Sequence, residues 1–186
     1  MLIVGAGGHG RSVAEALLAA GSFSIAGFVD DGTASDRVMG LPVLGRTADL
    51  VRLRGEANHA IVAIGKNESR ESLCNRLLAA GFELATVIHP RSIVSPSAEI
   101  AAGCAIMAGA VVGALARLGV GAIVNSGAVV DHDAQVMDFG HLGVGACMAG
   151  GTVLGRGAWM QAGAALGYGV RVPDGAVLPP GGSLSG

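Results

Sequence analysis

A six-residue period runs through the second half of the chain and limits its fold more than any other feature of the sequence. Every sixth residue from Val94 to Leu184 is aliphatic or methionine, without exception. Most residues three places further on are glycine, and nearly all residues four places further on are small. Neither an α-helix nor an alternating strand has this period. The pattern predicts a parallel β-helix, in which each hexad forms one short strand and one tight turn.

The hexads also predict the dimensions of this β-helix. Three hexads make one triangular coil, so the repeats form about five coils and a prism roughly 25 Å long at the ~4.8 Å spacing of neighbouring strands. The aliphatic residues stack inside the prism, and glycine falls where the turn needs a positive φ. Ser97, Leu115, Asp133 and Phe139 replace that glycine. The last two lie within the most polar stretch of the repeats, and interruptions of a regular pattern are where function is expected.

Charge divides the chain near residue 92. Nine of the twelve lysine and arginine residues precede residue 93, and the hexads follow it. We therefore expect two domains, residues 1–92 and residues 93–186. The apolar fraction of 51% and the net charge of −2 exclude a disordered chain. Because there are no basic runs, the chain offers no electrostatic surface for nucleic acid.

The first 92 residues alternate between strand and helix patterns. The sequence predicts strands over residues 2–4, 25–29, 60–64 and 84–88, and helices over residues 12–20 and 69–80. Glycine follows each helix, as is common at helix C-termini. Apolar strands that alternate with helices predict an α/β domain, with a small parallel sheet of about four strands and helices on its faces.

A glycine-rich loop, GAGGHG at residues 5–10, lies between the first strand and the first helix. Its amide groups and the N-terminus of the helix are suited to a pyrophosphate, because backbone donors and helix dipole point to the same place. Asp30 follows twenty residues beyond Gly10, where a dinucleotide fold keeps a carboxylate for the ribose. A domain of about four strands is small for a dinucleotide, so a mononucleotide or a nucleotide sugar fits better. A turn that only connects strand and helix remains the alternative.

No membrane span and no metal centre are expected. The uncharged stretch 100–116 reaches the lower length limit of a membrane span, but the hexads continue through and beyond it. The first residues lack the pattern of a secretion signal. The three cysteines, Cys74, Cys104 and Cys147, have no C-x-x-C spacing, which favours reduced structural thiols in the cytoplasm.

Five of the ten aspartate, glutamate, histidine and arginine residues of the repeats lie between Asn125 and His141. His132 stands between two aspartates, Asp131 and Asp133. A carboxylate beside an imidazole fixes its tautomer and raises its basicity, as a general base near neutral pH requires. Two alternatives are a solvated polar turn and a metal site, and no cysteine cluster or spaced histidine pair supports the metal.

Five segments together resemble bacterial sugar acetyltransferases of the bacillosamine and sialic acid pathways. They are GAGGHG at residues 5–10, FVDD ending at Asp31, AIGKN at 63–67, IHPRSIVSPSAEI at 88–100 and NSGAVVDHDAQVMDFGHLGVGA at 125–146. The last segment is the most specific. The resemblance covers essentially the whole chain and implies a left-handed β-helix behind a small Rossmann-like domain. It further implies acetyl-CoA as co-substrate and a homotrimer with active sites between neighbouring prisms.

The resemblance also assigns roles to individual residues. It implies that His132 is the general base, that Asp133 holds its imidazole, and that the backbone N–H of Gly150 receives the thioester carbonyl. His141 and Ala162, with Gly150, match positions that contact acetyl-CoA. Positions that match the nucleotide-sugar site are Gly8, His9, Gly10, Asp30, Asp31, Gly65, Lys66, Asn67 and Asn125.

These observations favour an acetyl-CoA-dependent N-acetyltransferase that acts on a nucleotide-linked 4-amino sugar of the UDP type. O-acetylation of sialic acid or a related sugar uses the same base, and a catalytically inactive nucleotide-binding trimer is a further alternative. The homotrimer has a physical motive, because apolar residues that point outward from a prism need a partner. The residues expected in this outward patch are Val111, Ile123, Val129, Val153 and Trp159.

Overall fold

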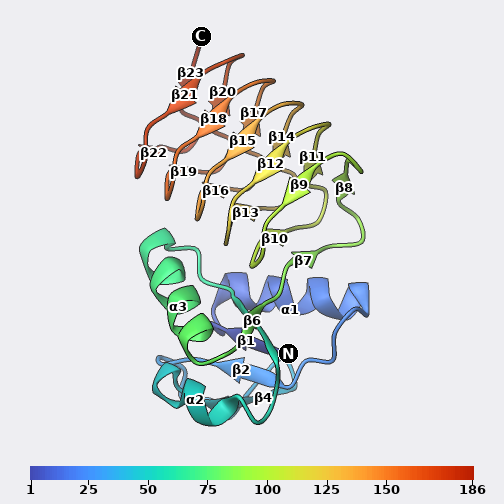
Figure 1. The fold of residues 1–186 in the computed structure, drawn as a ribbon, viewed down its shortest axis with the longest axis vertical. Helices are drawn as coiled ribbons and strands as arrows, with labels where there is room; N and C mark the ends of the chain where they lie inside the picture. The colour runs from blue at the N-terminus through green and yellow to red at the C-terminus, as the bar shows by residue number, and fades with distance from the viewer.

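The computed structural model describes all residues from 1 to 186. Figure 1 shows two layers, an α/β domain that contains the N-terminus and a prism of short strands that carries the C-terminus at its far end. None of the helices is both long enough and apolar enough to cross a bilayer. The α/β domain is followed by the parallel β-helix that the hexads predict.

The N-terminal domain is built on one six-stranded sheet with the order β3-β4-β2-β1-β5-β6. All neighbours are parallel except β3 and β4. The strand β1 lies near the middle of the sheet and is fully buried. The elements of this domain are β1 Leu2–Val4, α1 Gly8–Ala20, β2 Gly27–Val29, β3 Arg37–Val38, β4 Leu41–Gly45, the 3-10 helix Thr47–Asp49, α2 Leu50–Leu53, β5 His59–Val62, α3 Asn67–Ala79 and β6 Glu83–Leu84.

The sequence located the main elements of this domain but not its edges. The predicted strand over residues 2–4 is confirmed, and α1 begins four residues before the predicted helix. The expected sheet of about four strands was wrong, because β3 and β4 add an antiparallel edge. The expected strand over 84–88 was also wrong, because it is two strands in two different sheets. β6 completes the N-terminal sheet, whereas β7 at Val87–Ile88 pairs with the prism.

The prism consists of seventeen strands of two residues each, arranged in three parallel sheets that we call faces 1, 2 and 3. Each strand pairs with the strand one coil, or eighteen residues, later, as in the register of Val112 with Val130. Face 1 contains β7 Val87–Ile88, β10 Ala105–Ile106, β13 Ile123–Val124, β16 His141–Leu142, β19 Trp159–Met160 and β22 Val177–Leu178. Face 2 contains β8 Ile93–Val94, β11 Val111–Val112, β14 Val129–Val130, β17 Cys147–Met148, β20 Ala165–Leu166 and β23 Ser183–Leu184. Face 3 contains β9 Glu99–Ile100, β12 Arg117–Leu118, β15 Gln135–Val136, β18 Val153–Leu154 and β21 Arg171–Val172.

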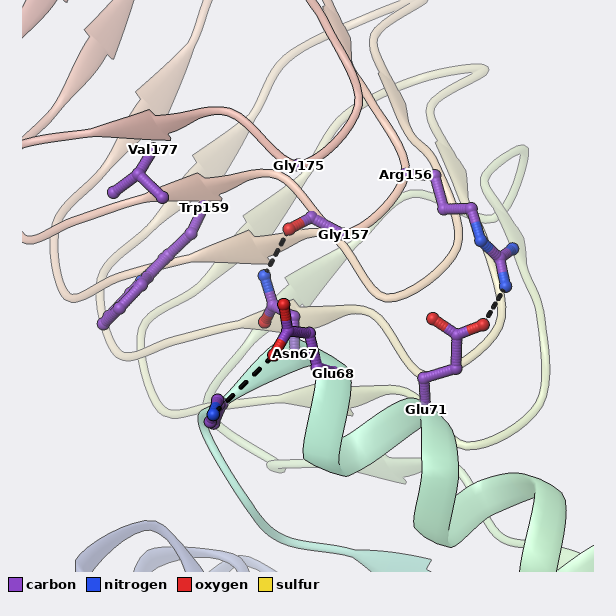
Figure 2. A pocket seen from close by; sticks show the side chains of 9 residues that line it. Asn67, Glu68, Glu71, Arg156, Gly157, Trp159, Gly175 and Val177 are labelled. Atoms are coloured by element: carbon purple, nitrogen blue, oxygen red, sulfur yellow. Dashed lines mark hydrogen bonds and ion pairs between the residues drawn. The ribbon is translucent and has the colours of Figure 1, made fainter.

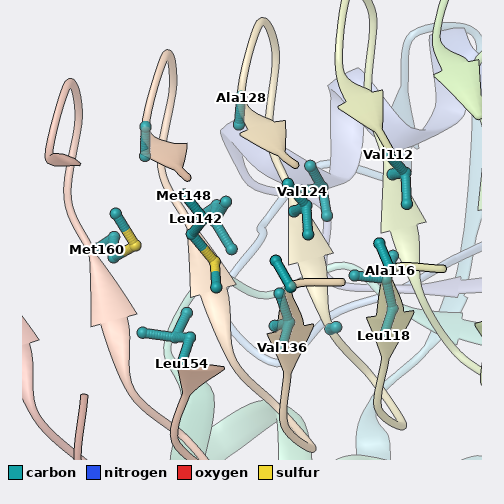
Figure 3. Close-up of a cluster of buried hydrophobic side chains, with 14 of the residues drawn as sticks. Val112, Ala116, Leu118, Val124, Ala128, Val136, Leu142, Met148, Leu154 and Met160 are labelled. Atoms are coloured by element: carbon teal, nitrogen blue, oxygen red, sulfur yellow. The ribbon is translucent and has the colours of Figure 1, made fainter. Parts of the chain in front are cut away.

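The second residue of nearly every strand points into the prism and builds its core (Figure 3). These aliphatic residues and the small residues that follow the turns form one cluster of 22 buried side chains. All eleven glycines at the predicted turn position have a positive φ. Leu115, Asp133 and Phe139 share that φ, near +58°, although a Cβ disfavours it. Ser97, at the same hexad position, does not have a positive φ.

The two domains share an apolar junction on face 1. Ile123 and Ala105 pack in one buried cluster with Val13 and Leu17 of α1. The expectation that Ile123 lies exposed was therefore wrong, because α1 covers this end of face 1. The expected outward residues do not form one patch either. Val111 and Val129 lie on face 2, Trp159 on face 1 and Val153 on face 3, where it is only 7% exposed.

Candidate active site

The corner between faces 2 and 3 carries a histidine between two carboxylates. The Nδ1 of His132 lies 2.8 Å from Oδ2 of Asp133. A carboxylate only accepts, so this contact places the proton on Nδ1 and leaves Nε2 as an acceptor. The positive φ of Asp133 turns its backbone at this point. The other neighbour, Asp131, accepts the backbone N–H of His132 at 2.8 Å.

These contacts make His132 the more basic of the two histidines in the polar stretch. The hydrogen bond that Nδ1 donates to Asp133 raises the pKa of His132 most, and the charge of Asp131 raises it further. The imidazole is about half exposed, so a substrate can reach Nε2. This arrangement has the features of a general base, with one nitrogen held and the other free.

Gly150 lies one coil beyond His132 at the same corner. A Cβ at this residue would lie 2.5 Å from Cε1 and 2.6 Å from Nε2 of His132. The absence of a side chain therefore makes room for the imidazole. The backbone N–H of Gly150 has no acceptor within the chain. A free N–H beside Nε2 of a base is what an oxyanion of an acyl transfer requires.

Tyr168 continues this column by one more coil. Its ring centre lies 6.3 Å from that of His132, and its Cε1 lies 2.9 Å from the position a Cβ of Gly150 would take. The side chain is 69% exposed. Sequence reasoning missed Tyr168, although its spacing of eighteen residues from Gly150 is one full coil and could have indicated it.

His141 has the opposite environment. It lies on face 1, is 5% exposed, and its ring stacks on Trp159 at 5.3 Å between centres. Its Nδ1 lies 3.1 Å from the carbonyl oxygen of Gly65, so Nδ1 carries the proton. Burial, and then the charge of Arg70, lower the pKa of His141 to about 3. The neutral ring is therefore a poor base, but its buried Nε2 has no partner and could accept from a ligand.

The glycine-rich loop presents unpaired donors at the N-terminus of α1. The backbone N–H groups of Gly8, His9 and Gly10 donate to no group of the chain. A Cβ at Gly10 would lie 2.0 Å from the carbonyl oxygen of Gly5, so only glycine lets the helix approach the strand this closely. No acidic residue lies in the first turn of α1. An anion such as a phosphate fits this place.

Asp30 and Asp31 lie at the carboxyl end of β2 and line a cavity of about 310 Å³ together with Gly5. Burial would raise the pKa of Asp30, but three backbone N–H donors outweigh it and hold that pKa below its ordinary value. One of these donors is Ala6, at 2.7 Å, so Asp30 also orders the glycine-rich loop. Asp31 accepts from the backbone and the hydroxyl of Thr47 at 2.7 and 2.8 Å.

A second cavity, of about 360 Å³, lies where α3 begins against the prism (Figure 2). Trp159 and Lys66 line it, and Lys66 forms an exposed ion pair with Glu68. The Nδ2 of Asn67 donates to the carbonyl of Gly157 at 2.7 Å. This bond ties α3 to the prism, so the amide nitrogen of Asn67 is already occupied within the chain.

The two remaining predicted residues, Asn125 and Ala162, lie on the corner between faces 1 and 2. The Oδ1 of Asn125 accepts the backbone N–H of Ser126 at 2.8 Å, and Ala162 is exposed. The candidate residues thus occupy three places in one chain. They are the corner of His132, the opposite corner of Asn125, and the junction of the N-terminal domain with face 1.

Comparisons with known proteins bear on both domains. Residues 1–77 match the family model of the PglD N-terminal domain. The structure of a variant of perosamine N-acetyltransferase from Caulobacter crescentus, in complex with CoA and GDP-perosamine, is 37% identical with a TM-score of 0.95. The match covers 98% of this chain and 87% of that one. No curated protein matches the chain significantly in sequence.

Two further structures extend the comparison. The acetyltransferase domain of PglB from Neisseria gonorrhoeae, in complex with acetyl coenzyme A, is 36% identical with a TM-score of 0.80, covering 95% of this chain and 94% of that one. WeeI from Acinetobacter baumannii is 23% identical with a TM-score of 0.72, covering 100% and 95%. At that identity WeeI supports the fold alone.

Proposed function

Since the chain belongs to the bacterial sugar acetyltransferases of the hexapeptide-repeat class, we propose that it transfers the acetyl group of acetyl-CoA to the 4-amino group of a nucleotide-linked sugar. The observation that carries this proposal is the pair of His132 and Asp133 above the unpaired N–H of Gly150. The relatives bound to CoA with GDP-perosamine, or to acetyl coenzyme A, support the two substrates.

The geometry suits direct attack without an acyl-enzyme. The sugar amine attacks the thioester carbonyl carbon while Nε2 of His132 removes a proton from the nitrogen. Asp133 holds the resulting imidazolium, and the N–H of Gly150 donates to the oxyanion. When the tetrahedral intermediate collapses, the C–S bond breaks and the CoA sulfur leaves, taking up the proton from His132. General base and oxyanion donor each contribute on the order of 10²-fold or more.

The nucleotide part of the acceptor belongs to the N-terminal domain in this proposal. The free N–H groups at residues 8–10 bind its phosphates, and the cavity beside Asp30 and Asp31 takes the nucleoside. A neutral His9 supports this role, because burial, and then the charge of Arg70, lower its pKa to about 4. Its Nε2 is buried without a partner and is available to the ligand.

Face 2 supports a homotrimer in which the active site is completed between copies. Its outward residues are apolar or small along the whole prism, and Ile93 is 69% exposed. The corners of His132 and Asn125 flank this face on its two sides. Around a threefold axis with face 2 inside, the first corner of one copy adjoins the second corner of the next. The outward residues of face 2 are Ile93, Val111, Val129, Cys147, Ala165 and Ser183.

The test is thiol release from acetyl-CoA with a panel of UDP-, GDP- and dTDP-linked 4-amino sugars and with sialic acid, beside a His132→Ala variant. Release with one amino sugar, lost in the variant, is the expected result. Release only with sialic acid would replace the proposal by O-acetylation. No release with any sugar, although a nucleotide sugar binds, would leave a nucleotide-binding trimer without activity. Because acetyl-CoA and nucleotide sugars are metabolites of the cytoplasm, we place the reaction there.

A further inference from the structure

Arg70 of α3 is buried without a counter-ion. It is 1% exposed and is the largest of the fully buried side chains. No carboxylate lies within ion-pair distance of its guanidinium. Burial lowers the pKa of Arg70 to about 10, which leaves it charged at neutral pH. A buried cation is costly unless its donors are satisfied, so the acceptors around Arg70 decide what it does.

The guanidinium joins three segments that are distant in sequence. Nε donates to the carbonyl of Gly121 and Nη2 to the carbonyl of Phe139, both at 2.7 Å. These two residues lie in prism turns one coil apart, at the corner of faces 3 and 1. Nη2 also donates to Oδ1 of Asn67 at 2.8 Å. The remaining bonds run from Nη1 to the carbonyls of Ile64 and Gly65, at 3.1 and 3.2 Å.

Gly65 connects the hydrogen bonds of Arg70 to His141. Its carbonyl oxygen accepts from Nη1 of Arg70 and from Nδ1 of His141. The second bond sets the tautomer of His141 and leaves Nε2 as an unpaired acceptor. A shift of the Gly65 carbonyl would release Nδ1 and let the other tautomer form. The position of that carbonyl relative to the prism depends on Arg70.

We propose that Arg70 is a positioning residue for acetyl transfer, whose guanidinium fixes the Gly65 turn on the prism and thereby holds His141 in the tautomer with Nε2 free. The effect on catalysis rests on the proposed function, whereas the effect on the tautomer does not. Lysine cannot replace this side chain. An ammonium has no planar fork and cannot reach two prism carbonyls and the Gly65 turn together.

The experiment compares Arg70→Lys with Arg54→Lys. Arg54 also donates to backbone carbonyls, those of Gly81 and Ala57, but only within the N-terminal domain. Its substitution controls for the loss of an arginine that stabilises this domain. Each protein is measured for thermal unfolding, for kcat and KM, and for the tautomer of His141. The tautomer is read from ¹⁵N shifts of histidine-labelled protein, with His141→Asn to assign the signal.

Arg70→Lys should fold and lose about 10- to 100-fold in kcat, because small displacements of positioned groups cost rates of this size. The KM for the nucleotide sugar should change little, and the His141 signals should move toward the Nε2-protonated tautomer. Arg54→Lys should leave kcat and tautomer unchanged. If Arg70→Lys does not fold, Arg70→Gln, which is uncharged and lacks the planar fork, is measured in the same way.

A folded Arg70→Lys variant with the wild-type tautomer would overturn the proposal, and so would activity lost only in proportion to the folded fraction. The tautomer needs no substrate to be observed. An enzyme that acetylates no sugar in the panel would therefore refute the proposed function and still show whether Arg70 positions His141.

Discussion

Gly150→Ala tests the geometry of the candidate site most directly. The new Cβ would lie 2.5 Å from Cε1 and 2.6 Å from Nε2 of His132, and 2.9 Å from Cε1 of Tyr168. Contacts under 3.0 Å are not tolerated, so something must move. The backbone is not the obstacle, since Ala102, Ala108 and Ala114 occupy the same place in other hexads. The half-exposed imidazole is the group free to give way.

The distance by which the imidazole of His132 must move determines how large a loss of kcat we expect. To restore ordinary contact the imidazole must retreat by roughly 1 Å, away from the unpaired N–H of Gly150 and out of line with Asp133. A displacement of about 1 Å costs on the order of 10²-fold in rate. Complete loss of a general base costs 10²- to 10⁴-fold. We expect kcat to fall at least about 10²-fold, with little change in the KM for the nucleotide sugar.

Steady-state thiol release measures the effect, and thermal unfolding checks the fold. Ala102→Ser is a matched control, because it adds one atom at the same hexad position on a corner without a histidine. Adding Tyr168→Ala to Gly150→Ala should not restore activity, since the contact with His132 remains. A Gly150→Ala enzyme within about threefold of wild-type kcat would refute the assigned roles of Gly150 and His132.

Three further predictions follow from charge and burial. Asp133→Asn removes the main cause of the raised pKa of His132. The acidic limb of the pH profile of kcat/KM should therefore move to lower pH, and kcat should fall. An acidic limb that does not move would mean that a group other than His132 titrates there. Val129→Asp on face 2 should dissociate the proposed homotrimer in size-exclusion chromatography with light scattering, whereas Gln135→Glu on face 3 should not; a monomeric wild-type protein would contradict the proposed homotrimer. Because burial lowers the pKa of both His141 and His9, the protonation of each on unfolding should reduce the free energy of unfolding as pH falls from about 6.5, by about 1.4 kcal/mol per pH unit and residue. His141→Asn should therefore remove about half of the slope that urea titrations measure between pH 6 and pH 5, and an unchanged slope would contradict the lowered pKa of His141.

The sequence predicted what depends on local pattern and missed what depends on docking. The hexads predicted the prism and the positive φ of its turn glycines, because each turn repeats one backbone geometry, whereas the positive φ of Leu115 and Phe139 was not predicted. They also brought His132 and Asp133 together, since adjacent residues of one turn suffice. The edge strand β3 was missed because two residues carry no periodicity. The burial of Ile123 depends on α1, which no pattern within the prism indicates.

The sequence spacing of the residues in the polar stretch determines which of them can meet within one copy of the chain. His132 and His141 are nine residues apart, which is half of an eighteen-residue coil. Side chains half a coil apart lie on different sides of a prism, so one copy cannot bring both histidines to one substrate. If both act on the same acetyl transfer, the second must come from the neighbouring copy. Gly150, by contrast, is a full coil from His132 and lies directly against it.

This argument predicts complementation between two inactive chains. His132→Ala and His141→Asn should each lose activity alone. Unfolded together at equal amounts and refolded as mixed trimers, they should regain up to about one quarter of wild-type activity, because one interface in four then pairs the intact His132 of one copy with the intact His141 of the next. Mixing without refolding is the control. Mass spectrometry verifies that the refolded trimers contain both variants. If such mixed trimers stay inactive, then each active site is contained in one chain, and face 2 does not bring His132 of one copy to His141 of the next.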